Sequence, residues 1–174
     1  MMNITIIITE RLILRTLLHS DAEILHQLIF SVPEVMAQSF SGNTLTKEES
    51  RAFVDDHFDQ VGTGKQLGVL ALKDTNEIIG FSGLLETSVL SKKDYEIGFV
   101  LGKEYWGKGY ASEIGRAQIT HGLGLLKCDR LLALVQPSNS ASIAVIEKMG
   151  MLLHSTVETE DRGVKHVYMI DEMV

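Results

Sequence analysis

The sequence predicts an α/β fold, with a mixed sheet of about seven strands and helices on both faces. Short β-rich segments at the start, middle and end of the chain are interleaved with stretches of helical periodicity. This order contains one late strand–helix–strand crossover, which is expected to be parallel and right-handed. With 174 residues, of which 45% are hydrophobic and 22% charged, the chain is expected to form one domain over residues 1–174.

The overall charge and the chain ends limit the class of protein. A net charge of −7 excludes phosphate-backbone binding as a first interpretation and weakly favours cationic amines. The lone cysteine, Cys128, cannot form an intramolecular disulfide, which fits a reducing compartment. No signal-peptide pattern opens the chain, and no apolar run approaches the ~20 residues of a membrane span. We therefore expect a cytoplasmic protein without a membrane or nucleic-acid partner.

The first half of the chain reads as two strands, two helices and then three strands. Capping boxes at Ser20–Glu23 and Thr46–Glu49 predict the starts of the helices. Pro33 is expected to end the first helix, and Gly62 with Gly64 the second. The strands are expected at residues 4–8, 11–16, 67–73, 77–86 and 94–101.

The second half reads as helix, strand, helix and two strands. A long helix is expected from Ala111 to Leu126, and a shorter one begins at a cap on Ser138 or Asn139 and stops at Gly150. The strands are expected at residues 130–136, 151–158 and 164–171, the last two around a turn at 161–163.

The junction from Gly102 to Ser112 is the strongest chemical signal. Its glycines let the backbone curl, so that consecutive N–H groups point at one spot just before a helix begins. Such a junction can cradle a pyrophosphate, although a plain glycine turn has the same local pattern. The dinucleotide fingerprint fails because Ser112 stands at its third glycine position. The Walker pattern fails because Gly109 follows Lys108.

Three segments together resemble the GNAT superfamily of acyl-CoA-dependent N-acyltransferases. YEIGFVLGKEYWGKGYASE (95–113) is similar to the strand, pyrophosphate loop and helix of that family. NSASIAVIEKMGM (139–151) resembles its second motif. TERLILRTLLHSDAE (9–23) resembles the amino end of the branch that acetylates ribosomal-protein N-termini. The resemblance implies acetyl-CoA as co-substrate, no metal, and a sheet splayed beside the cofactor.

The resemblance also implies the site residues. The backbone of Phe99, Val100 and Leu101 would pair with the pantetheine arm, and a backbone N–H there would hold the thioester oxyanion. Asn139 would contact pantetheine, and Ser142 would lie near the sulfur. Glu104 stands where the family often has Gln or Arg, so pyrophosphate binding would rest on backbone N–H groups with help from Lys108. The pyrophosphate would be held by Trp106, Gly107, Lys108, Gly109, Tyr110, Ala111 and Ser112.

Glu96 is the candidate general base. It interrupts the alternation of apolar residues in the strand 94–101, and burial raises the pKa of a carboxylate toward values useful in a base. Direct transfer needs a neutral amine, so a base that deprotonates the acceptor assists the attack. The alternative is that Glu96 pairs with a neighbouring basic side chain. The candidate catalytic residues are thus Glu96, Ser142 and Asn139.

The remaining polar residues give weaker signals. Cys128 is expected to be a boundary residue, and the six histidines show no metal-ligand spacing. His57 lies on the apolar stripe of the second helix, with Val54, Phe58 and Val61, and is expected to be packed. Asp55, Asp56 and Asp59 are expected to form a solvated acidic patch, which borders the acceptor groove if the resemblance holds.

We therefore expect transfer of an acetyl group from acetyl-CoA to a primary amine by direct attack in a ternary complex. The resemblance favours a protein N-terminus as the acceptor. Two alternatives stay open at this point: acetylation of a small amine such as a polyamine, an aminoglycoside or an amino acid, and a non-catalytic acyl-CoA-binding module. An exposed edge strand near the carboxyl end would permit a homodimer.

Overall fold

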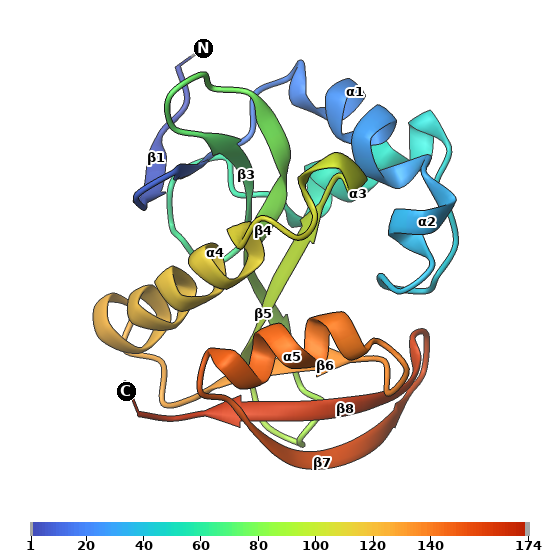
Figure 1. The fold of residues 1–174 in the computed structure, drawn as a ribbon, viewed down its shortest axis with the longest axis vertical. Coiled ribbons are helices and arrows are strands. Elements are labelled where there is room, and N and C mark those ends of the chain that lie inside the picture. The colour runs from blue at the N-terminus through green and yellow to red at the C-terminus, as the bar shows by residue number, and fades with distance from the viewer. Residues whose placement is uncertain (1, 173–174) are drawn as a thin grey trace.

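The structure is a computed structural model that describes residues 2–172, and its centre is one mixed sheet (Figure 1). The sheet has eight strands in the order β1-β2-β3-β4-β5-β6-β8-β7, where about seven were expected. Each strand lies within one residue of a segment that the sequence predicted to be a strand. The strands are β1 (Thr5–Ile8), β2 (Leu12–Arg15), β3 (Leu67–Leu72), β4 (Ile78–Thr87), β5 (Asp94–Leu101), β6 (Leu131–Val135), β7 (Leu152–Thr159) and β8 (Gly163–Ile170).

The longer helices lie where the periodicity predicts them, but two of them end in a π-helical turn, and two short helices, α2 and η2, were not predicted. Within residues 2–172, no helix is long and apolar enough to cross a bilayer. The helical elements are α1 (Asp21–Leu25), η1 (His26–Phe30), α2 (Pro33–Met36), α3 (Lys47–His57), η2 (Lys103–Tyr105), α4 (Tyr110–Ile119), η3 (Thr120–Leu125) and α5 (Ser140–Lys148). The predicted first helix ends before Pro33, as expected. A second short helix, α2, begins at this residue because proline fits the first helical position.

Helices cover both faces of the sheet, as predicted (Figure 1). On β3, Val69 packs into the cluster formed with α1 to α3. The next residue, Leu70, packs on the opposite face against Ile114 of α4. This alternation buries both faces of the central strands. Farther along, Ile146 of α5 packs with Ala133 of β6 in a third cluster.

Strands β5 and β6 separate soon after they meet. They pair in parallel, as the crossover predicts, but only at Tyr95 with Leu131 and Glu96 with Leu132. On its other edge β5 pairs with β4 over its whole length, from Asp94 to Leu101. The backbone of residues 97–101 therefore has a strand on one side only, which leaves an opening in the middle of the sheet.

One of the two predicted capping boxes is wrong. At Thr46 both reciprocal hydrogen bonds are present, so α3 begins as predicted. Ser20 makes no side-chain cap, because its backbone is helical (φ −71°, ψ −15°) and not extended as a cap requires. Glu23 instead accepts a hydrogen bond from Gln27 and pairs with Lys47.

The end of α3 also differs from the prediction. The chain leaves the helix at Phe58, which is extended and bridges to Leu67 of β3. Val61 is therefore outside the helix and 71% exposed, not part of its apolar stripe. Asp59 is fully buried, so it does not belong to a solvated acidic patch.

Candidate active site

The glycine-rich junction forms an open turn followed by a helix without a side-chain cap. Gly107 (φ +73°) and Gly109 (φ +83°) adopt the left-handed conformation, and α4 begins at Tyr110. No atom lies within 4 Å of the place where a Cβ of Gly107 would be. The first N–H groups of a helix have no partner within the helix. The turn therefore presents backbone donors and the positive end of α4 to an anion, and it fits a pyrophosphate.

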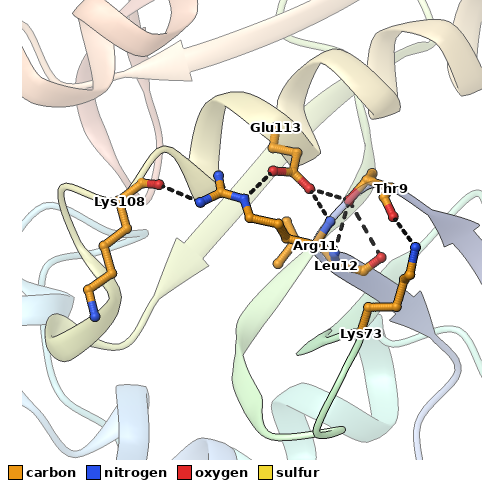
Figure 2. A network of polar contacts seen from close by, with 6 residues as sticks. All are labelled: Thr9, Arg11, Leu12, Lys73, Lys108 and Glu113. Atoms are coloured by element: carbon orange, nitrogen blue, oxygen red, sulfur yellow. Dashed lines mark hydrogen bonds and ion pairs between the residues drawn. The ribbon is translucent and has the colours of Figure 1, made fainter.

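Arg11 supports this turn from the loop between β1 and β2 (Figure 2). Its Nη1 donates to the Lys108 carbonyl oxygen at 2.9 Å, and its Nε donates to Glu113 Oε1 at 2.7 Å. Its guanidinium lies 4.4 Å from the ring centroid of Tyr110. The side chain of Lys108 extends away from these contacts (Figure 2). Arg11 thereby fixes the turn at a carbonyl and leaves the N–H groups of the turn free.

Glu113 joins the loop between β1 and β2 to α4. Its Oε2 accepts hydrogen bonds from Thr9 Oγ1 at 2.5 Å and from the Arg11 backbone N–H at 2.9 Å. Burial alone would raise the pKa of Glu113, but these hydrogen bonds and the charge of Arg11 hold it below its ordinary value. The charged carboxylate is thus a stable anchor for the amino-terminal segment.

The other predicted pyrophosphate residues lie around the same turn. Trp106 is 47% exposed, and its indole N–H donates to the Leu101 carbonyl oxygen at 2.9 Å, which ties the turn to the end of β5. Tyr110 and Ala111 pack against the hydrophobic cluster that contains Ile114 of α4. Ser112 lies in the first turn of α4. The predicted loop residues are therefore contiguous in space.

A cavity of about 110 Å³ occupies the opening between β5 and β6. Phe99 and Val100 line it from β5, and Asn139 and Ser142 line it from the start of α5. Leu101 lies outside this lining and packs in the cluster around Ile114. The free backbone edge of β5 can pair with an extended amide-containing chain, so the opening fits a pantetheine arm.

Asn139, one of the two residues predicted to cap this helix, is the cap of α5. Its side-chain oxygen accepts a hydrogen bond from the Ser142 backbone N–H at 3.1 Å. This contact explains why an asparagine stands four residues after the end of β6. The amide nitrogen of Asn139 remains available to the cavity that the residue lines.

A larger cavity of about 950 Å³ adjoins the first and shares residues with it. Phe40, Leu85, Glu96 and Arg162 line both cavities. The charged residues that line the larger cavity are Asp56, Lys65, Glu86, Glu96, Asp161 and Arg162. The two hollows therefore meet at Glu96 and Arg162.

Glu96 forms a bidentate ion pair with Arg162. Both carboxylate oxygens accept hydrogen bonds from the guanidinium, at 2.9 and 3.0 Å, and Glu96 is 4% exposed. Burial lowers the pKa of Arg162, but the hydrogen bond and charge of Glu96 outweigh it and hold the pKa above its ordinary value. The sequence left open whether Glu96 pairs with a basic side chain, and the structure shows that it pairs with Arg162. Each carboxylate oxygen has a further lone pair, so Glu96 can also accept a hydrogen bond from a group in the cavities.

Several residues of the site gave no functional signal in the sequence. Arg162 was assigned only to a turn, and Lys165 only to the last strand. Phe40 adopts φ +51°, a strained conformation for a bulky residue, where it borders both cavities. The expectation that His57 is packed is wrong, because it sits at the last position of α3, exposed, and lines the larger cavity. For Lys165, the available clue in the sequence was its place among the apolar residues of β8.

The fold, the open glycine turn and the pair of cavities together suit a transferase with room for a long cofactor and a separate acceptor. A sequence model of the acetyltransferase (GNAT) domain matches residues 11–152. The chain therefore belongs to the GNAT acetyltransferase family. This result favours an enzyme over a non-catalytic acyl-CoA-binding module.

Relatives with similar sequences cover nearly the whole chain. The uncharacterized protein YkkB of Bacillus subtilis is 31% identical over 92% of this chain and 92% of its own. The uncharacterized N-acetyltransferase p20 of Bacillus licheniformis is 30% identical over 81% of this chain and 79% of its own. The structure of a GNAT acetyltransferase from Bacillus anthracis has a TM-score of 0.80 at 27% identity, covering 96% of this chain and 98% of its own.

More distant structures share the fold. An acetyltransferase from Salmonella typhimurium that modifies the N-terminal serine of ribosomal protein L7/L12 has a TM-score of 0.78 at 21% identity, covering 97% of this chain and 99% of its own. A spermidine N-acetyltransferase from Vibrio cholerae, in complex with CoA and spermine, has a TM-score of 0.74 at 18% identity, covering 91% of this chain and 94% of its own. The fold thus serves both kinds of acceptor.

Proposed function

We propose that residues 1–174 form one domain that transfers the acetyl group of acetyl-CoA directly to a primary amine. The observation that carries this proposal is the position of Glu96, buried at the junction of the two cavities. The smaller cavity opens along the free edge of β5, and the larger one has room for an acceptor. A carboxylate between them stands where an attacking amine must lose its proton.

Each part of the site has a proposed role. The turn from Trp106 to Ser112 binds the pyrophosphate through backbone N–H groups. The edge of residues 99–101 pairs with the pantetheine arm and supplies an N–H to the oxyanion. Asn139 and Ser142 border the end of that arm. Glu96, oriented by Arg162, takes the proton of the amine directly or through water.

For the acceptor we propose a protein N-terminus. The larger cavity, at about 950 Å³, is at the upper end of the range for small-molecule pockets and has room for several residues of a peptide. Its aromatic walls, Phe40, Phe53 and Tyr95, suit the side chains of such a peptide. A polyamine is the second candidate, because four carboxylates against two basic side chains line the same cavity.

The test is the release of CoA thiol from acetyl-CoA with a panel of acceptors. The panel contains peptides that begin with Ser, Ala or Met, then spermidine, an aminoglycoside and free amino acids. We expect turnover on the peptides. In Glu96→Gln, the loss of the base lowers kcat/KM about 100-fold or more, while the amide keeps the shape of the site.

Glu158→Gln is the matched control, since Glu158 lies exposed on β7, away from both cavities. It should keep the activity of the wild type. Because the Glu96→Gln change would leave the half-buried Arg162 without its ion pair, thermal unfolding of each variant verifies folding before the kinetics are compared. Turnover on small amines alone would contradict the proposed acceptor. Full activity of a folded Glu96→Gln would remove Glu96 as the base.

A further inference from the structure

Lys165 is a buried cation inside the smaller cavity. It lies on β8, is 3% exposed, and lines the cavity together with Asn139 and Ser142. In the part of the chain that the structure describes, its ammonium makes no ion pair within 4.0 Å and no hydrogen bond. The ammonium has no partner from the protein and lies in a ligand cavity, so it can pair with an anion that binds or forms there.

Arg162, Lys165 and Glu96 are the charged side chains that line the smaller cavity, so its lining carries one surplus positive charge. On β5, Glu96 lines the same cavity as Lys165, but both carboxylate oxygens of Glu96 already accept hydrogen bonds from Arg162. From the turn before β8 come Asp161 and Arg162 itself. Neighbouring β6 (Leu131–Val135) contributes no charged side chain. Burial and the charge of Arg162 lower the pKa of Lys165, and the opposing effects of Glu96 and Asp161 do not restore it.

Under the proposed function, acetyl transfer generates an anion at the sulfur of CoA, and the pantetheine arm brings that sulfur into this cavity. Neither of the nearby hydroxyl groups serves well as its acid. Ser142 has an aliphatic hydroxyl, which is a weak proton donor. Tyr168 lies on the opposite face of β8 from Lys165. Burial raises the pKa of the Tyr168 hydroxyl, and so does Glu147 of α5, whose Oε1 accepts its hydrogen bond at 3.4 Å. An ammonium with a lowered pKa is a better acid than either of them.

Building on the proposed function, we propose that Lys165 is a catalytic residue that protonates the departing sulfur of CoA. When the amine nitrogen bonds to the acetyl carbon, the carbon–sulfur bond breaks and its electron pair goes to sulfur. Sulfur receives a proton from the Lys165 ammonium, and the nitrogen gives its surplus proton to Glu96. Both groups line the same cavity, so one proton transfer from Glu96 to Lys165 restores the starting state.

The first experiment measures the ionisation of bound CoA without any turnover. Reduced CoA is titrated on the wild type, and its thiolate is followed by ultraviolet absorbance as the pH rises. A proton donor matched to sulfur titrates over the same pH range as the thiol, and the ammonium favours the thiolate while it keeps its proton. We therefore expect the first ionisation of this pair to occur at least about tenfold more readily than that of the thiol in free CoA. In Lys165→Met this shift should disappear, and in Lys165→Arg, which keeps the charge, it should remain.

The second experiment uses acetyl-CoA turnover with the best acceptor. We expect kcat to fall about 100-fold in Lys165→Met, with little change in the Kd of CoA's oxygen analogue, which carries a hydroxyl in place of the thiol. Lys165→Arg should not restore kcat, because guanidinium is too weak an acid. The control is Lys148→Met, an exposed position on α5.

The outcomes separate this inference from the proposed function. If the wild type does not bind CoA, the proposed function fails. If CoA binds and its thiol ionises alike in the wild type and in Lys165→Met, the inference about Lys165 is wrong and the function stands. A Lys165→Met defect confined to the KM of carboxylate-bearing acceptors would also overturn it, since Lys165 would then bind the acceptor.

Discussion

Asp59 is a buried carboxylate that holds the loop between α3 and β3 in place through hydrogen bonds to its backbone. Its Oδ1 accepts the N–H groups of Val61 and Gly62, at 3.0 and 2.7 Å, and its Oδ2 accepts that of Gly64 at 2.8 Å. Its own N–H donates to the Leu67 carbonyl at 2.7 Å, at the start of β3. Burial alone would raise the pKa of Asp59, but the N–H donors outweigh it and hold the pKa below its ordinary value.

We predict that Asp59→Asn lowers the free energy of unfolding by about 2 kcal/mol at neutral pH, because an amide nitrogen replaces one accepting oxygen. A lowered folded-state pKa stabilises the protein above the unfolded pKa, near 3.9, and this contribution is lost as the pH falls through the folded value. The difference between wild type and variant should therefore shrink below about pH 4. Urea unfolding at several pH values measures it. The exposed Asp55→Asn is the control, and an equal loss there would contradict the argument.

At the scale of elements, the pyrophosphate turn depends on a distant segment. The loop between β1 and β2 supplies Arg11, which contacts the Lys108 carbonyl and Glu113 of α4. The turn is rich in glycine and would be mobile without such support. The amino-terminal segment thus supports the proposed cofactor site although it does not line either cavity.

We predict that Arg11→Met raises the KM for acetyl-CoA about tenfold and changes kcat less than twofold. The reason is that loss of the charge-assisted hydrogen bonds loosens the binding turn but leaves the chemistry at Glu96 intact. Titration calorimetry with CoA should show the same weakening. Arg51→Met is the control, because its guanidinium donates to a backbone carbonyl far from the turn, that of His19. A fall in kcat alone would show that Arg11 does not act through the turn.

At the scale of the molecule, the sheet consists of two parts with a narrow connection. Strands β1 to β5 form one part and β6 to β8 the other, and only two residue pairs of β5 and β6 link them. Helix α4 packs on β5 and also contacts α5 across the opening. A ligand that fills the opening would add contacts to both parts.

We predict that CoA stabilises the whole protein. At a free concentration 100 times its Kd, binding adds about 2.7 kcal/mol, which corresponds to a rise in Tm of roughly 5–10 °C for a chain of this length. Adenosine 3′-phosphate 5′-diphosphate keeps the pyrophosphate but lacks the pantetheine arm. It should give a smaller rise than CoA at the same free concentration, because the loss of the arm's contacts raises its Kd. Calorimetric scans compare the two ligands. An equal shift would indicate that the opening between β5 and β6 does not hold the arm.

The sequence predicted the elements well because their signals are local. Capping of α3 at Thr46 and of α5 at Asn139 needs only neighbouring residues, and both were found. The predictions failed where a distant contact decides the outcome. The α3 stripe was extended to Val61 because nothing local shows that Phe58 bridges to Leu67. Cytoplasmic location and dimerisation remain predictions.

The sequence by itself determined the α/β class, the glycine turn before α4 and Glu96 as the candidate base, since each rests on residue types at short spacing. Only the tertiary structure decided that Arg162 pairs with Glu96, that Arg11 supports the turn, and that Lys165 enters the cavity. Arg162 lies 66 residues from Glu96 along the chain. Such contacts depend on how the sheet brings distant strands together, and no local pattern encodes the partner.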